Sequence, residues 1–309
     1  MGVYFPPGGK YALSDSIVMR GACRWLDLMG CGIGVKAVSS FDGIKALIRV
    51  DTGTQPVVMI ERIGDYWTIA GAALPGTGVE QNSINPLIIR DGGGLCRNTV
   101  GSGPMFLENA GSGAQSIFTG INVWARQLDT EISDALESYI KNDGARLWIL
   151  GIKTEKDTTV ILAVNGAKTE VLGGFLYPTQ VVASTLAAWI NNESSMSLSY
   201  ITNAFGSPNQ DYTVQVREVR NGITGELNES EVIARVNASM VPLFVGYLAP
   251  EGRTGGGGGW TGGPPGPPGQ YPRRGGGQQG SSPGGGSGGR HILSGGDRGG
   301  STGSLRGGR

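Results

Sequence analysis

The chain has 309 residues and no net formal charge, because 25 basic residues balance 25 acidic ones. Residues 253–309 hold seven arginines and one aspartate, a net charge of +6, which leaves −6 for the remainder. An acidic body disfavours nucleic acid as a partner. The single histidine, His291, lies in the basic segment, so the body lacks the histidine that Ser-His-Asp and Cys-His mechanisms require.

Short β segments, separated by Gly, Asn, Asp or Pro, follow one another along the chain as far as residue 247. One stretch, 130–141 (TEISDALESYIK), places Ile132, Leu136 and Ile140 on one face and predicts a short helical insertion. The predicted strands cover residues 3–5, 16–20, 46–50, 57–61, 66–70, 86–90, 105–108, 147–150, 159–164, 169–172, 196–200, 212–219 and 241–247.

Many short strands suit either an antiparallel sandwich or a parallel β-solenoid. Hairpin dipeptides such as Asn165-Gly166 occur too rarely to join every pair of strands. A weak internal repeat favours the solenoid, because GIKTE at 151–155 is followed by GAKTE at 166–170. Such a repeat would place Glu155 and Glu170 at equivalent positions of adjacent coils.

The three cysteines, Cys23, Cys31 and Cys96, lack metal-ligand spacing and are interpreted as small core residues. We therefore expect neither a metal nor a cofactor. No apolar run reaches about eighteen residues, so no membrane span is expected. The first ten residues lack the charged and apolar regions of a signal peptide.

From residue 251 to residue 309 the chain is dominated by Gly, Pro, Ser, Gln and Arg, a composition that predicts a disordered tail. The segments around Arg273, Arg298 and Arg306 are similar to RGG motifs that bind RNA. The alternative, which we favour because the arginines are sparse, is a flexible, solubilising terminus.

Residues 3–11 (VYFPPGGKY) resemble the opening strand of the pectate-lyase-like superfamily, with one extra residue between Pro6 and Tyr11. Residues 122–128 (NVWARQL) and 147–155 (LWILGIKTE) resemble later coils of that superfamily, the second being similar to a stretch of the β-1,3-glucanases. There the glutamate is usually followed by His, whereas Lys156 follows Glu155 in this sequence.

The resemblance implies an all-β, right-handed parallel β-helix. Its coils would occupy residues 1–180, a β segment completing or capping the helix would occupy 181–250, and the tail would follow. In that superfamily a capping helix precedes the opening strand, so this chain resembles an N-terminally truncated form. An uncapped end exposes unpaired strands, so self-association through it is expected. The family further implies a secreted or surface location and a polysaccharide partner.

Glycoside hydrolysis usually needs two carboxylates roughly 5–9.5 Å apart, and strands of adjacent coils lie about 4.8 Å apart. Stacked Glu155 and Glu170 would therefore be a candidate catalytic pair, although both could equally be solvated residues neutralised by nearby lysines. Trp124, Trp148 and Tyr177 are candidate sugar-binding aromatics, with core packing as the alternative interpretation. The body has no Asp-x-Asp cluster for Ca²⁺, so lyase chemistry is disfavoured relative to hydrolysis.

Three functions follow as hypotheses. The first is a polysaccharide-interacting β-helix that is not itself a complete enzyme. The second is a glycoside hydrolase acting on a β-glucan or pectin-type polymer. The third, disfavoured by the acidic body, is RNA association through the tail.

Overall fold

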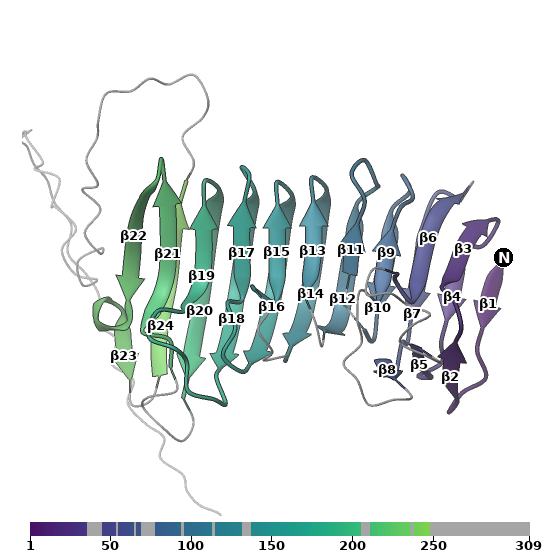
Figure 1. The fold of residues 1–309 in the computed structure, drawn as a ribbon, viewed down its shortest axis with the longest axis horizontal. Coiled ribbons are helices and arrows are strands. Elements are labelled where there is room, and N and C mark those ends of the chain that lie inside the picture. Colours follow the sequence, from purple (N-terminus) through teal and green to yellow (C-terminus); the bar gives the residue numbers. More distant parts are fainter. Residues whose placement is uncertain are drawn as a thin grey trace, which may run out of the picture. The chain divides into compact units, whose positions relative to one another are not determined.

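The fold is that of a computed structural model, which Figure 1 shows as a ribbon. The body, which contains all of the described residues, forms one compact unit ending at Gly258. The described residues are 1–35, 45–53, 55–64, 66–68, 78–93, 96–112, 115–131, 137–204, 211–235 and 238–247.

The strands alternate between two long sheets, so that each turn of the chain adds one strand to each sheet (Figure 1). Neighbouring strands within a sheet are parallel until the last strands of the body. Near the N-terminus a third, short sheet joins each turn. This all-β arrangement of mostly parallel sheets is a β-solenoid, as the sequence predicts. The hand of the coil stays a prediction.

The first long sheet, sheet A, runs in the spatial order β1 (Gly2–Tyr4), β4 (Trp25–Asp27), β7 (Val58–Glu61), β10 (Leu87–Arg90), β12 (Met105–Ser112), β14 (Asn122–Thr130), β16 (Arg146–Glu155), β18 (Lys168–Tyr177), β20 (Ser195–Asn203), β24 (Ala238–Gly246) and β23 (Ile233–Arg235). The short sheet B contains β2 (Lys10–Leu13), β5 (Gly32–Val35) and β8 (Tyr66–Thr68).

The second long sheet, sheet C, runs in the order β3 (Ile17–Gly21), β6 (Ile48–Gly53), β9 (Val79–Gln81), β11 (Cys96–Asn98), β13 (Ser116–Thr119), β15 (Ile140–Asp143), β17 (Ile161–Val164), β19 (Ala187–Asn192), β21 (Val214–Arg220) and β22 (Ile223–Asn228). A 3₁₀ turn, η3 (Glu229–Glu231), follows β22.

Four neighbouring strands of sheet A contain a left-handed residue at the same register. Asn109, Gln127, Gly151 and Gly173 have φ of 49°, 54°, 84° and 86°. The flanking pairs keep their register, so these four residues lie opposite one another across the sheet. A left-handed residue bends a strand, so each of these strands has an earlier half and a later half that face different directions.

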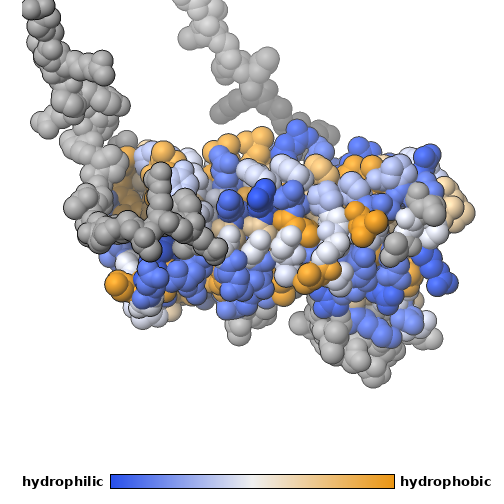
Figure 2. Space-filling model, turned by 90° about the horizontal axis from the view of Figure 1, so that it is seen from above, coloured by the Kyte–Doolittle hydropathy of each residue, from blue (hydrophilic) through white to orange (hydrophobic). Residues whose placement is uncertain are grey.

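Side chains alternate between the interior and the solvent along each strand. In β16, Leu147 and Ile149 are buried, whereas Trp148 is half-buried and Leu150 is 58% exposed. Stacking repeats this alternation from rung to rung and gives one continuous apolar core between the sheets. Figure 2, viewed from above Figure 1, shows hydrophobic residues interspersed among hydrophilic ones on the outside.

The solenoid ends in antiparallel pairs. Strand β24 pairs antiparallel with β20 and with β23, and β22 pairs antiparallel with β21. The β21–β22 hairpin turns at Asn221-Gly222, both with positive φ, as this dipeptide predicts. The same dipeptide at Asn165-Gly166, also with positive φ at both residues, does not form a hairpin. It joins β17 to β18, which lie in different sheets.

The predicted helix over 130–141 is wrong at both ends. Thr130 ends strand β14, and Ile140 and Lys141 begin strand β15, while residues 132–136 lie outside the described residues. The backbone of both ends instead pairs with strands of neighbouring rungs. These partners are distant in the sequence, so a local helical pattern does not predict them. The tail, 251–309, also lies outside the described residues. Cys31 and Cys96 are buried as predicted, Cys23 is half-buried, and none of the three forms a disulfide within the described residues.

Strand β16 offers a matched test of the core, because it carries two leucines with opposite burial. Leu147 is 1% exposed, so Leu147→Ala should lower the free energy of unfolding by about 2–5 kcal/mol through the cavity it leaves. Leu150→Ala should cost less than about 0.5 kcal/mol. Urea unfolding followed by far-UV circular dichroism measures both, and equal losses would contradict the register described here.

Candidate functional site

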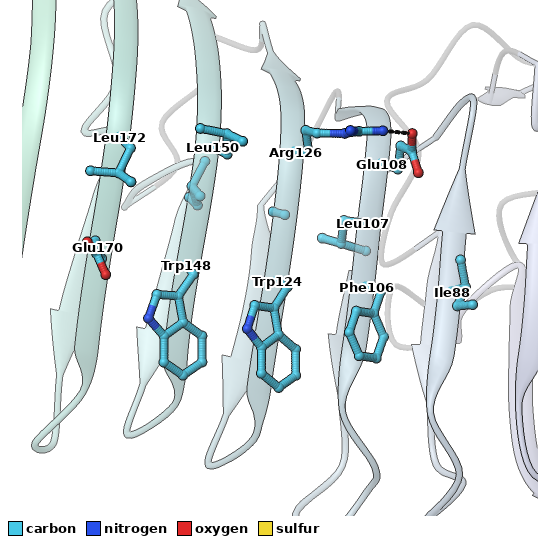
Figure 3. A pocket seen from close by; sticks show the side chains of 12 residues that line it. Ile88, Phe106, Leu107, Glu108, Trp124, Arg126, Trp148, Leu150, Glu170 and Leu172 are labelled. Atoms are coloured by element: carbon cyan, nitrogen blue, oxygen red, sulfur yellow. Dashed lines mark hydrogen bonds and ion pairs between the residues drawn. The ribbon is translucent and has the colours of Figure 1, made fainter.

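Outward-facing aromatic side chains stack on three successive rungs of sheet A. Phe106 of β12 lies opposite Trp124 of β14, and Trp124 lies opposite Trp148 of β16. Ile88 precedes this row on β10 and Glu170 continues it on β18. Parallel in-register pairing therefore brings residues from five rungs into one line, which Figure 3 shows from close by.

The three rings are nearly parallel and offset from one another. Phe106 and Trp124 have centroids 4.9 Å apart at an interplanar angle of 10°, and Trp124 and Trp148 have centroids 5.2 Å apart at 9°. These spacings exceed the ~3.5–4.0 Å of carbon atoms in direct contact, so each ring is displaced sideways over the next. Part of each ring face stays uncovered, and Phe106 and Trp124 are 39% and 38% exposed.

A second outward row lies beside the aromatic one, two residues further along each strand. It consists of Glu108, Arg126, Leu150 and Leu172, which face each other in that order across four rungs. Arg126 donates to Glu108 in an ion pair, whereas Leu150 and Leu172 are 58% and 51% exposed. Together the two rows line a shallow groove of about 350 Å³ with mostly apolar walls and a few charged groups (Figure 3).

Glu155 and Tyr177 lie elsewhere, in the later halves of β16 and β18. They face each other across the rung, and the Tyr177 hydroxyl donates to a carboxylate oxygen of Glu155. The Lys153 ammonium lies 3.0 Å from the same Glu155 oxygen, contacts Asp129 and Glu131, and lies 5.0 Å from the Tyr177 ring centroid. The groove residues therefore include Trp124, Trp148 and Glu170, but neither Tyr177 nor Glu155.

The surroundings of Glu155 hold it in the charged form. The hydrogen bond from Tyr177, with a further one from Lys153, holds the pKa of the Glu155 carboxyl below its ordinary value. Partial burial, together with the hydrogen bond to the same carboxylate, raises the pKa of the Tyr177 hydroxyl. A carboxylate held ionised in this way is a poor general acid, because it has no proton to give near neutral pH.

The predicted stacking of Glu155 on Glu170 is wrong. The register pairs Glu170 with Trp148, 22 residues earlier, and pairs Glu155 with Tyr177. The 15-residue repeat between GIKTE and GAKTE is therefore not a rung. Seven residues of strand separate Glu155 from the position opposite Glu170, about 20 Å with a bend between them, which is too far for paired catalysis.

Sequence reasoning missed Phe106 and the leucines of the second row. Phe106 falls in a predicted strand, but Met105 and Leu107 on either side of it are also apolar, so the sequence carries no signal that Phe106 faces outward. Its stacking on Trp124 depends on a rung of 18 residues, whereas Trp124 stacks on Trp148 across 24. Without the register, no single spacing in the sequence links the three rings.

Within the described part of the chain, no group of three or more His, Cys, Asp or Glu side chains is placed to hold a metal ion. The helices found there include none that is long and apolar enough to traverse a bilayer. Comparison of the chain with known protein families, with curated proteins and with solved structures found no match in any of the three. The resemblance of residues 3–11 and 147–155 to pectate-lyase-like proteins therefore stays a prediction.

The Tyr177–Glu155 hydrogen bond predicts a defined pH effect. The pKa of the Glu155 carboxyl is lower in the folded state than in the unfolded state. Such a group stabilises the fold at pH values above its unfolded-state pKa, and this stability is lost as the pH falls through the folded-state pKa. Tyr177→Phe should therefore raise the Glu155 pKa, and should destabilise the protein at neutral pH but hardly at acid pH. A side-chain NMR titration measures the pKa, and an unchanged value in the variant would refute the contact.

Proposed function

We propose that this protein binds polysaccharide on the outer face of sheet A, through the aromatic row Phe106–Trp124–Trp148. The observation that carries the proposal is the set of partly uncovered, near-parallel rings in a shallow groove. Soluble proteins normally cover large apolar side chains, and a contiguous exposed apolar patch indicates a contact surface.

The chemistry of the groove suits sugars. A pyranose ring has C–H groups on its faces and hydroxyls around its edge, so it packs on an aromatic face while its rim seeks hydrogen bonds. Trp124 and Trp148 offer such faces, and Glu170, Arg126 and Glu108 are charged groups lining the same groove. Mostly apolar walls with a few well-placed polar groups are the usual composition of ligand sites.

The shape of the groove favours a polymer over a single sugar. The row from Ile88 to Glu170 crosses five rungs, so it is about 19 Å long at ~4.8 Å per rung. The groove is shallow and open to solvent, so it does not enclose a small molecule. An extended chain could contact several rungs at once, and such repeated weak contacts add up to useful affinity.

Hydrolysis is the second candidate, and Glu170 beside Trp148 is the feature that favours it. The other carboxylate lining the groove, Glu108, lies three rungs away, about 14 Å, and is paired with Arg126. That separation exceeds the roughly 5–9.5 Å over which two carboxylates share a glycosidic bond. Binding without turnover is therefore the better-supported function.

Removing the two indoles should remove binding. Trp124→Ala/Trp148→Ala should weaken binding to soluble β-1,3-glucan or polygalacturonate by about fivefold or more, since each exposed aromatic contact contributes about 0.5–1.5 kcal/mol. Affinity electrophoresis in polymer-containing gels, confirmed by calorimetry, measures the change. Tyr247→Ala removes another exposed aromatic outside the groove and should leave binding unchanged.

Two outcomes would count against the proposal. If the intact protein binds neither polymer, or if the tryptophan variant binds as tightly as the intact protein, the aromatic row is not a sugar platform. If the protein releases sugar from either polymer and Glu170→Gln abolishes that release, hydrolysis replaces binding as the function.

A further inference from the structure

Resting on the proposed polysaccharide binding, we infer that the polymer carries an anionic group, held between Arg146 and Lys168 at the edge of the aromatic groove. The starting observation is one of register. Arg146 is the first residue of β16 and Lys168 the first of β18, and the two lie directly opposite each other. Both side chains are exposed.

Like charges placed opposite each other across a strand pair are destabilising. Elsewhere on these sheets, facing charges have opposite signs, as in Glu80 with Arg97 and Asp129 with Lys153. Asp27 also faces Glu61, but there each carboxylate forms its own ion pair, with Arg62 and Arg90 respectively. Each carboxylate of this acidic pair is therefore neutralised by an arginine. The basic pair, Arg146 and Lys168, would need an anionic group for the same purpose.

Arg146 and Lys168 lack such compensation within the described residues, where neither side chain forms an ion pair or side-chain hydrogen bond. Their neighbours on the adjoining rungs, Asn122 and Ser195, are uncharged. Two cationic side chains on strands about 4.8 Å apart, neither in an ion pair within the described residues, form a site that a carboxylate or sulfate would complete.

The position of the pair ties it to the aromatic row. Arg146 precedes Trp148 by two residues and Lys168 precedes Glu170 by two, so all four lie on the same face of sheet A. Two residues of strand span about 6.6 Å, so an anion between the cations would lie beside a sugar stacked on Trp148. Glu170, which lines the groove next to Trp148, would disfavour a second anion at its own position. The site would therefore also determine on which side of the bound polymer the anionic groups lie.

The test compares polymers that differ only in charge. Polygalacturonate and its fully methyl-esterified form share one backbone, and so do dextran sulfate and dextran. The intact protein should bind polygalacturonate about tenfold more tightly than the ester, since two exposed ion pairs supply roughly that factor. This preference should disappear in Arg146→Gln/Lys168→Gln and should weaken as salt is added.

The matched control is Lys10→Gln/Arg20→Gln, which removes two exposed cations from strands β2 and β3 outside the groove. It should keep the preference, and loss of preference in this control would reduce the effect to overall charge and overturn the inference. A preference for dextran sulfate over dextran as well would assign any strong anion, whereas preference confined to polygalacturonate would assign a carboxylate.

The two proposals fail in different ways. If Trp124→Ala/Trp148→Ala weakens binding but the intact protein binds the ester and the acid equally, the aromatic platform stands and the anion site is wrong. The anion site is also wrong if the preference survives in Arg146→Gln/Lys168→Gln. If no polymer binds, both proposals fall together.

Discussion

The in-register parallel pairing of successive rungs is the constraint on which the rest of this structure depends. Each residue on one rung has a fixed partner about 4.8 Å away on the next, so every position becomes part of a row along the solenoid. Inward rows are mostly apolar, because they form the core. They also hold buried polar pairs such as Thr130 opposite Thr154. Outward rows are free to vary, but each side chain must tolerate the neighbours that the register imposes.

The outward rows of sheet A show two ways of meeting that requirement. Along the row that runs through Glu61, Arg90, Glu108 and Arg126, neighbouring charges have opposite signs. In the aromatic row beside it, flat rings stack on one another. Both arrangements are stable as rows, but they present different surfaces, since the ion-pair row presents charged groups and the aromatic row leaves apolar faces in water. The left-handed residues at Gln127 and Gly151 then separate this surface from the charged cluster around Lys153.

The fold class could be predicted from the sequence because strand punctuation is local. Residues 57–61 and 86–90, for example, match β7 and β10 closely. The structure extends four predicted strands, those over 105–108, 147–150, 169–172 and 196–200, and most of the others are shifted or shortened by one to three residues. Strands of three residues, such as β9 and β11, carry too little pattern to be recognised. The ends of the predicted helix became strands because their partners on neighbouring rungs, distant in sequence, determined their conformation.

The candidate site could be predicted only in part, since it depends on register. Trp124, Trp148 and Glu170 were recognisable as residue types, but the rungs between β10 and β20 contain 18, 18, 24, 22 and 27 residues. Because the rungs differ in length, the sequence has no fixed repeat period from which the register could be predicted. The GIKTE and GAKTE segments misled because their glycines differ in role: Gly151 bends the middle of β16, whereas Gly166 belongs to the turn before β18.

Stability alone does not account for the groove. A row of ion pairs, such as the one through Arg90, Glu108 and Arg126, would satisfy the register without exposing Phe106, Trp124 and two leucines to water. Offset stacking recovers about 0.5–1.5 kcal/mol per ring pair, but it does not remove the cost of the uncovered faces. The like-charged pair Arg146 and Lys168 beside Trp148 adds a second cost on the same surface. Two unfavourable features of different kinds, apolar exposure and like-charge repulsion, meet within two residues of each other, and one bound anionic sugar would relieve both.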